Sequence, residues 1–441
     1  MYKVASFVAF LTIISKILGL ARDLVIAHYF GTSMQADAFN MAYLFTGNFF
    51  IIFGGVGGPF YSAVVAVLPK YIFEHSAKDI WNFLKQLVLN TSYVLLAFCV
   101  LIFFLKPYVL NVFIDKQTNP EYFNLTLFNI DILLPLILIA GPIGIMFGIL
   151  NCYKKYLEPS LSPAMINVAL IVAVFFMGDS FSGLALAIGT SIGGVLSLFL
   201  QVPALVDIKK NHLKDNPSQK DLSQKSFSEI LYPALLATII SQLIVFVDSF
   251  FCRDLEQGSW SALVLANRLV QMPLGVLLTA FLVPVFPRIG EVIARGDNLE
   301  VARLLKKSIK TMVMLCVPAV LVGCIWSDEI IRILFQRGAF SEHSTQMVAS
   351  VFFYLCFSIL PYIIRDSLTR ALYSYGDSKS PLYVIIFAIF VKLILNYFLV
   401  NKFGLSGLAI STTIISILNA GLLFIALLNK LNLDLKNFFA R

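Results

Sequence analysis

Residues 12–23 read Thr-Ile-Ile-Ser-Lys-Ile-Leu-Gly-Leu-Ala-Arg-Asp, and they lie inside an apolar run from Val4 to His28. A run of this length is typical of an α-helix that crosses a bilayer. On a helical wheel the polar and small side chains of the run fall within an arc of roughly 120°; they are Thr12, Ser15, Lys16, Gly19, Arg22 and Asp23. A charge at the membrane centre costs about 2.5–3.5 kcal/mol even on the insertion scale. This charged stripe therefore has to face protein or a water-filled cavity rather than lipid.

The composition agrees with a membrane protein of many spans. The 441 residues are 59% hydrophobic and only 13% charged, whereas about a quarter of the residues of a soluble domain are charged. A soluble enzyme is therefore a poor interpretation. The six cysteines lie in or at the ends of apolar runs without a C-x-x-C pair, and the four histidines are scattered. We expect no disulfide, no metal site and no cofactor.

Apolar runs predict twelve membrane spans: 4–28, 38–69, 81–105, 123–152, 159–178, 183–205, 228–252, 259–287, 304–327, 345–374, 380–401 and 404–429. Most of the Lys and Arg residues between them lie on the side that holds both termini. Because positive loops stay in the cytoplasm, we expect both termini there. The net charge of +8 then reflects topology, and no nucleic-acid partner is expected.

The chain reads as two halves joined by a polar segment. Residues 206–227 are Lys-rich and separate an N-terminal lobe, 1–205, from a C-terminal lobe with a short tail, 228–441. Two motifs recur at one separation: Pro-Lys at 69–70 against Pro-Arg at 287–288, and Ser-Pro at 162–163 against 380–381. With six spans each, the halves predict a parallel repeat about the membrane normal. The predicted fold is all-α, with two six-helix lobes around a central cleft.

Charged residues inside the spans suggest an anion site in that cleft. Arg268 lies in the eighth span at a depth similar to that of Arg22. Guanidinium forks suit phosphate oxygens, and a lysine such as Lys16 adds a point charge. The alternative is that Arg22 pairs with Asp23 or Asp37 as a structural lock. Both interpretations remain open from the sequence.

A second polar set lies in the C-terminal half. Asp248 is in the seventh span, Lys392 and Asn396 share one face of the eleventh span, and Thr412 belongs to a hydroxyl cluster in the twelfth. Asp248 needs a counter-charge, and Lys392 is the obvious candidate. The alternative is a coupling-ion site, because carboxylate, amide and hydroxyl oxygens suit Na⁺. A fixed ammonium would occupy or oppose such an ion.

Several motifs carry a resemblance to a known family; they are 15–23, 30–31, 36–39, 266–269, 334–340 and 370–381. Together they resemble the MurJ (MviN) lipid II flippase family of the multidrug/oligosaccharidyl-lipid/polysaccharide exporter superfamily. The resemblance implies a MATE-like fold. It also implies a flippase rather than an enzyme, a multi-pass protein of the bacterial inner membrane, and a monomer whose partners are lipid II and membrane lipids.

Residue by residue, the resemblance assigns roles. Family cavity positions correspond to Arg22, Asp23, Asp37, Asn167, Gln242 and Arg268, and Lys16 replaces a family Arg. Asp248 matches a carboxylate of a sodium site seen in some members. Lys392 and Asn396 stand where some members have an Asn and an Asp of that site, which opposes Na⁺ binding. Coupling to Na⁺ or to the membrane potential remains open.

The chain also departs from the family pattern. In the second span it carries Phe50-Ile51 and Gly55 where many members have two arginines and a glutamate, as in a cyanobacterial-type variant. The sequence ends after the twelfth span, where many members continue for two more. The expected function is outward flipping of an undecaprenyl-pyrophosphate-linked peptidoglycan precursor by alternating access. The alternatives are a flippase for another lipid-linked oligosaccharide and a cation-coupled drug exporter of the same fold.

Overall fold

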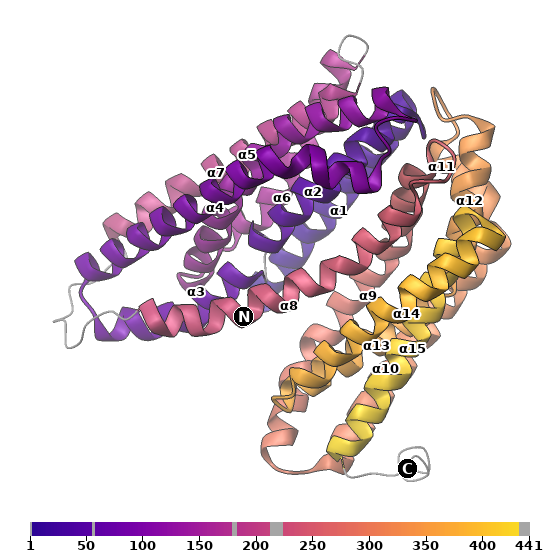
Figure 1. Ribbon diagram of the computed structural model, residues 1–441. Helices are drawn as coiled ribbons and strands as arrows, with labels where there is room; N and C mark the ends of the chain where they lie inside the picture. The colour runs from indigo at the N-terminus through magenta and orange to yellow at the C-terminus, as the bar shows by residue number, and fades with distance from the viewer. Residues whose placement is uncertain (1, 55–57, 179–182, 212–223, 432–441) are drawn as a thin grey trace. The chain divides into compact units, whose positions relative to one another are not determined.

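The computed structural model describes residues 2–54, 58–178, 183–211 and 224–431, and every regular element in these ranges is an α-helix (Figure 1). The helices of the first half are α1 Tyr2–Phe30, α2 Met34–Gly54, α3 Pro59–Glu74, α4 Ala77–Phe113, α5 Pro120–Cys152, α6 Leu157–Met177, α7 Leu184–Asn211 and α8 Gln224–Phe251. Those of the second half are α9 Ser259–Ala294, α10 Asn298–Ile325, α11 Ser327–Phe335, α12 Glu342–Cys356, α13 Ile359–Ser374, α14 Lys379–Phe403 and α15 Leu405–Leu431. The all-α prediction is confirmed for these residues.

Each predicted span coincides with one helix or with two consecutive helices. In the described part of the chain, nine segments are long and apolar enough to cross a membrane, with α2 and α3 counted together as Met34–Ile72. The pair α12 and α13 would make a tenth. Helices α1 and α9, whose side chains are described only in part, match the remaining two predicted spans.

Two predicted elements differ from the structure. The single span 345–374 is two helices, α12 and α13, bent by 49°. The break lies at Phe357 and Ser358, and the Ser358 hydroxyl donates to the carbonyl of Leu355. The short helix α11 was not expected, because nine residues are too few for a recognisable apolar period. Residues 55–57 of the predicted second span lie outside the described residues.

Glycines bring the helices of the first half into backbone contact. A Cβ on Gly144 of α5 would lie 2.4 Å from the Phe53 carbonyl oxygen of α2, and one on Gly54 would lie 2.8 Å from the Ala140 oxygen. A Cβ on Gly193 of α7 would lie 2.4 Å from the Ile166 Cα of α6. Small residues at such crossings let membrane helices approach closely. The close approach holds α2, α5, α6 and α7 together around the site described below.

Contacts divide the chain into two compact units, Met1–Gln242 and Leu243–Arg441. The division falls inside α8, between Gln242 and Leu243, and not in the predicted Lys-rich linker 206–227. Residues 212–223 of that linker lie outside the described residues. In the second unit, buried side chains of α9, α10, α13 and α15 form one apolar core that includes Ile289, Leu305, Leu372 and Leu427. The predicted lobe bounds stay a prediction.

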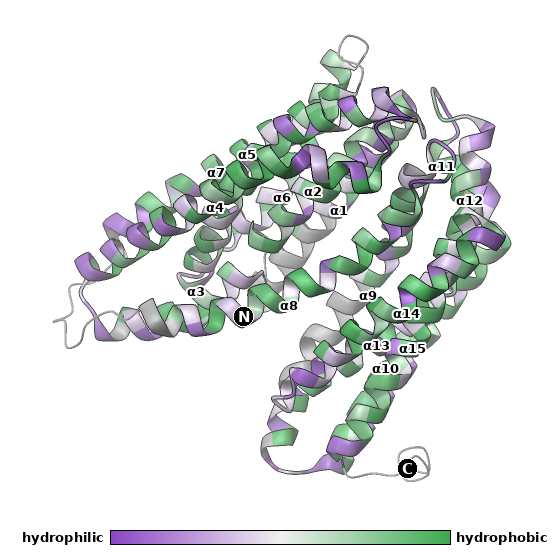
Figure 2. Ribbon diagram, in the orientation of Figure 1, coloured by the Kyte–Doolittle hydropathy of each residue, from purple (hydrophilic) through white to green (hydrophobic). Residues whose placement is uncertain are grey.

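The outward faces of the helices suit lipid. On α4 the side chains of Tyr93, Phe103, Phe104 and Tyr108 are exposed. Figure 2 shows hydrophobic residues along the middle of most helices and hydrophilic residues near many helix ends. The caps lie at those ends: the Ser76 hydroxyl accepts from the Asp79 N–H at the start of α4. The chain is therefore a multi-pass membrane protein.

Candidate functional site

Helix α1 places Arg22 with each of its three guanidinium nitrogens in a hydrogen bond. Nε and Nη2 donate to Asp23 Oδ1 at 3.0 and 2.8 Å, and Nη1 donates to Asn167 Oδ1 at 3.1 Å. The Arg22 side chain is 19% exposed and that of Asp23 is 8% exposed. A charge-assisted fork of this kind is stronger than a neutral hydrogen bond. In this state Asp23 neutralises Arg22, and Asn167 orients it.

Asn167 joins α6 to α1 at two points. Its Oδ1 accepts from Arg22, and its Nδ2 donates to the Ser15 carbonyl oxygen at 3.4 Å. A Cβ on Gly19 would lie 3.7 Å from the Asn167 Nδ2, which is an ordinary van der Waals distance. The Asn167 amide therefore also lies close to α1 at Gly19. The part of the polar stripe that holds Ser15, Gly19 and Arg22 therefore faces α6 within the first unit, which agrees with the expectation that a charged helix face contacts protein rather than lipid.

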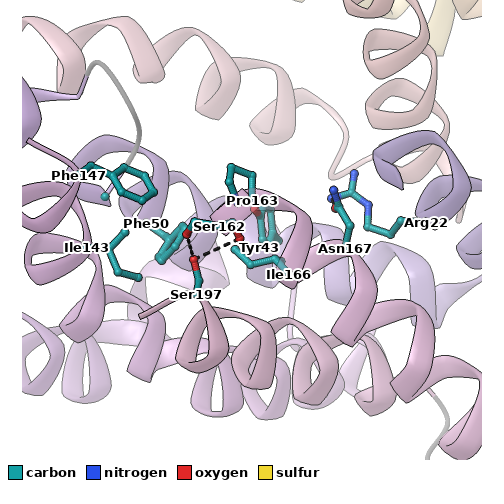
Figure 3. A pocket seen from close by; sticks show the side chains of 11 residues that line it. Arg22, Tyr43, Phe50, Ile143, Phe147, Ser162, Pro163, Ile166, Asn167 and Ser197 are labelled. Carbon is teal, nitrogen blue, oxygen red and sulfur yellow. Dashed lines mark hydrogen bonds between the residues drawn. The ribbon is translucent and has the colours of Figure 1, made fainter. Parts of the chain in front are cut away.

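Arg22 lies at one end of a pocket of about 260 Å³ in the first unit, with Asn167 beside it and Phe147 at the other end (Figure 3). The other side chains that line it are uncharged; they are Tyr43, Phe50, Ile143, Ser162, Pro163, Ile166 and Ser197. Arg22 is therefore the charged group among the described lining residues. A cationic end on an otherwise neutral pocket favours an anionic group of a ligand.

One contact within α2 and one contact between α6 and α7 shape the wall of the pocket. Tyr43 lies one turn before Gly47 on α2, and a Cβ on Gly47 would fall 2.4 Å from the Tyr43 ring, so the glycine allows the ring to lie along its own helix. Ser162 and Ser197 join α6 to α7: their hydroxyls are hydrogen-bonded, and the Ser197 hydroxyl also donates to the Ser162 carbonyl oxygen at 3.2 Å. These contacts satisfy hydroxyls that would be costly to bury alone.

The remaining predicted anion-site residues lie on three helices besides the α6 of Asn167, namely α1, α2 and α8, or on α9 in the second unit. Lys16 is half-buried on α1, Asp37 is buried near the start of α2, and Gln242 is half-buried on α8. Arg268 is half-buried on α9 in the second unit. The prediction that Arg268 and Arg22 face one space stays a prediction.

The four polar residues predicted for the C-terminal half do lie together. The Lys392 ammonium is 2.8 Å from Asp248 Oδ2 and donates to Thr412 Oγ1 at 2.8 Å. The Asn396 amide donates from Nδ2 to Asp248 Oδ1 at 3.0 Å. All four residues are buried, and Lys392 is 1% exposed. They join α8, α14 and α15 through one charge-neutral cluster.

Sequence reasoning missed some of these residues. Tyr43, Ser162 and Ser197 line the pocket, although Ser162 was noticed only as part of a repeated Ser-Pro pair. For Tyr43, the glycine four residues later, Gly47, is a pattern that could have indicated its position. No sequence pattern links Ser162 to Ser197, because the contact depends on how α6 packs on α7.

Comparison with known proteins identifies relatives over nearly the whole chain. The family described as "Lipid II flippase MurJ" matches residues 26–440. A Synechocystis protein named "Probable lipid II flippase MurJ" is 30% identical over 452 residues, covering 97% of this chain and 81% of the relative. A Burkholderia cenocepacia protein named "Lipid II flippase MurJ" is 26% identical over 423 residues, covering 94% of this chain and 81% of its own length.

Solved structures agree on the fold. One described as "Lipid II flippase MurJ, inward closed conformation" superposes with a TM-score of 0.81 at 24% identity, covering 98% of this chain and 89% of the other. An inward-facing multidrug resistance MATE family transporter superposes with a TM-score of 0.76 at 13% identity, covering 96% and 98%. The MATE-like prediction is confirmed. Because the family match spans residues 26–440 and the Synechocystis relative aligns over 97% of the sequence, this chain belongs to the MurJ lipid II flippase family.

Proposed function

We propose that this chain moves an undecaprenyl-pyrophosphate-linked peptidoglycan precursor, lipid II, from the inner to the outer leaflet by alternating access. The observation that carries the proposal is Arg22 at the end of a pocket whose other described lining residues are uncharged, in a chain of the MurJ family. A pocket built to expel cations would need acidic lining residues instead. The pocket therefore favours an anionic lipid over a cationic drug.

Arg22 is the proposed first ligand of the pyrophosphate. Its Nε and Nη2 are held by Asp23, a single carboxylate that a doubly charged pyrophosphate can displace. Asn167 keeps Nη1 in place during the exchange. Lys16 and Arg268 add cationic contacts, and Asp37 and Gln242 complete the proposed site.

The pocket volume limits what enters it. Ligand pockets usually measure about 300–1,000 Å³, so 260 Å³ suits the pyrophosphate and the groups next to it rather than the whole head group. The sugars and peptide then extend out of the pocket, and the isoprenoid tail stays in lipid. No bond is made or broken in this cycle.

The membrane potential is the proposed driving force. With the cytoplasm negative and both termini cytoplasmic, outward movement of an anion gains up to about 2.3 kcal/mol per charge per 100 mV. Two pyrophosphate charges would gain up to about 4–5 kcal/mol. Charge that the protein itself carries across reduces this gain.

The test replaces Arg22 with alanine in cells depleted of their resident lipid II flippase. We expect translocation, measured by the accessibility of lipid II to an externally added probe, to fall about tenfold or more, because a charge-assisted hydrogen bond is worth about 1.5–3 kcal/mol. Arg295→Ala, at an exposed arginine that follows α9, is the matched control and should flip normally. Expression of both variants is measured in parallel.

A second variant separates the anion site from the structural lock. If Arg22 only neutralises Asp23, the double variant Arg22→Ala/Asp23→Ala regains activity, because no unpaired carboxylate remains buried. If Arg22 binds the substrate, the double variant stays inactive. Normal flipping by both Arg22→Ala and Arg268→Ala would disprove the proposed site.

A further inference from the structure

Lys392 is the most deeply buried charge of the described C-terminal helices, and its ammonium binds two oxygen atoms from two other helices. Asp248 Oδ2 and Thr412 Oγ1 each lie 2.8 Å from Nζ. A further oxygen of the same cluster, Asn396 Oδ1, is buried and has no hydrogen-bond partner in the part of the chain that the structure describes. A carboxylate oxygen and a hydroxyl oxygen bound to a buried cation resemble part of a metal-ion cage, with an ammonium in the position of the ion.

A sodium ion, which the family resemblance implies for some members, does not fit the residues present here. Its carboxylate and hydroxyl ligands would be Asp248 and Thr412, and both already bind the Lys392 ammonium. The charges of Asp248 and Lys392 cancel, so a second cation would leave a net charge in a buried site, which is costly. Both the geometry and the charge balance oppose Na⁺.

We propose that the Lys392 ammonium is a covalently attached substitute for a soluble coupling ion. It fills the oxygen cage permanently and joins the end of α8 to α14 and α15 in every state in which the cage is intact. The chain then works without Na⁺, which leaves the membrane potential to drive transport. This last step rests on the proposed function, whereas the occupation of the cage does not.

The proposal makes a specific prediction about a variant that lacks the ammonium. Lys392→Ala removes the cation and leaves the Asp248 carboxylate with Thr412 Oγ1 and the unpartnered Asn396 Oδ1. This set carries one negative charge and contains the ligand types that Na⁺ prefers. The variant should therefore gain a response to Na⁺ that the unaltered protein lacks.

The experiment measures the thermal unfolding midpoint of the full chain, purified in detergent, in NaCl and in choline chloride at equal ionic strength. We expect the midpoint of the unaltered protein to be the same in both salts. For Lys392→Ala we expect NaCl to raise it by about 2–4 °C, since an ion that binds only the folded state stabilises it. Lys402→Ala removes an exposed lysine of the same helix and should show no difference between the salts.

Two further variants test whether the Na⁺ response comes from this site. Adding Thr412→Val to Lys392→Ala removes one ligand oxygen and should reduce the Na⁺ response. If Lys392→Ala does not fold in either salt, the same measurement is made on Lys392→Asn. A Na⁺-specific shift in the unaltered protein overturns the proposal, and so does the lack of any Na⁺ response in the variants. Lipid II flipping in Na⁺-free vesicles is measured separately, so a protein that flips nothing refutes the proposed function without affecting the binding result.

Discussion

Arg22 shows how the next residue in the chain neutralises a charged group on a membrane helix. Its fork is held by the carboxylate of the next residue, as is that of Arg365 by Asp366 on α13. The two arginines differ in their surroundings: the Arg22 side chain is 19% exposed and lines a pocket, whereas that of Arg365 is 34% exposed and lies over the Tyr362 ring. An adjacent carboxylate avoids the cost of leaving a buried guanidinium unpaired.

The Asp377 carboxyl predicts a pH dependence outside the membrane. The Ser380 backbone N–H, the Ser380 hydroxyl and the Lys430 ammonium hold the pKa of Asp377 below its usual value of 3.8. A lowered folded-state pKa gives stability that is present above pH 3.8 and lost as the pH falls through the folded value. We therefore expect Asp377→Asn to weaken the fall of the unfolding midpoint as the pH is lowered below about 4. Asp328→Asn, at an exposed residue of α11, is the control, and an unchanged pH profile for Asp377→Asn would contradict the assignment.

At the scale of elements, glycines decide which helices touch. Gly54 and Gly144 set the contact between α2 and α5, and Gly193 sets the contact between α6 and α7. These are the helices that line the pocket, apart from α1. Because the contacts are between backbones, no side-chain rearrangement can absorb an added methyl group.

A pair of glycine substitutions tests this packing. Gly144→Ala places a Cβ 2.4 Å from the Phe53 carbonyl oxygen, and we expect it to cost about 1–3 kcal/mol of unfolding free energy. Gly421→Ala on α15 meets no atom within 4 Å and should be neutral or stabilising by up to about 1 kcal/mol through helix propensity. Thermal unfolding in detergent compares the two, and equal midpoints would refute the close-contact argument.

For the whole molecule, the two units repeat one connection with reversed charges. In the first unit Lys155, in the turn between α5 and α6, forms an ion pair with Asp207 near the end of α7. In the second unit Asp377, in the turn between α13 and α14, lies 3.6 Å from Lys430 near the end of α15. In each half, the first residue of the pair lies in the turn that precedes the fifth predicted span. The second residue lies at the end of the sixth predicted span. This correspondence is the one that the predicted duplication of a six-span lobe would produce.

The positive-inside rule predicts which side of the membrane each helix end faces. By this rule both ion pairs lie on the cytoplasmic side. In a variant without native cysteines, Lys210→Cys should react with a membrane-impermeant maleimide only after cells are permeabilised. Arg337→Cys, which follows α11, should react in intact cells. Both native side chains are exposed, so access through the membrane decides the result. The opposite labelling pattern would invert the proposed orientation.

The helices and the polar stripe on α1 could be predicted from the sequence, because hydropathy and helical periodicity act over a few residues. The family could be predicted as well, because its motifs are short and continuous in the chain. The sequence also identified Asp248, Lys392, Asn396 and Thr412 as one polar set, since a buried carboxylate requires a counter-charge. The hydrogen bond from Arg22 to Asn167 and the contact between Ser162 and Ser197 across two helices could not be predicted from the sequence. The tertiary structure alone decided that the Lys392 ammonium occupies the oxygen cage. Contacts between residues far apart in the chain depend on which helix faces meet and how closely, and glycine-set backbone packing, rather than local pattern, determines that geometry.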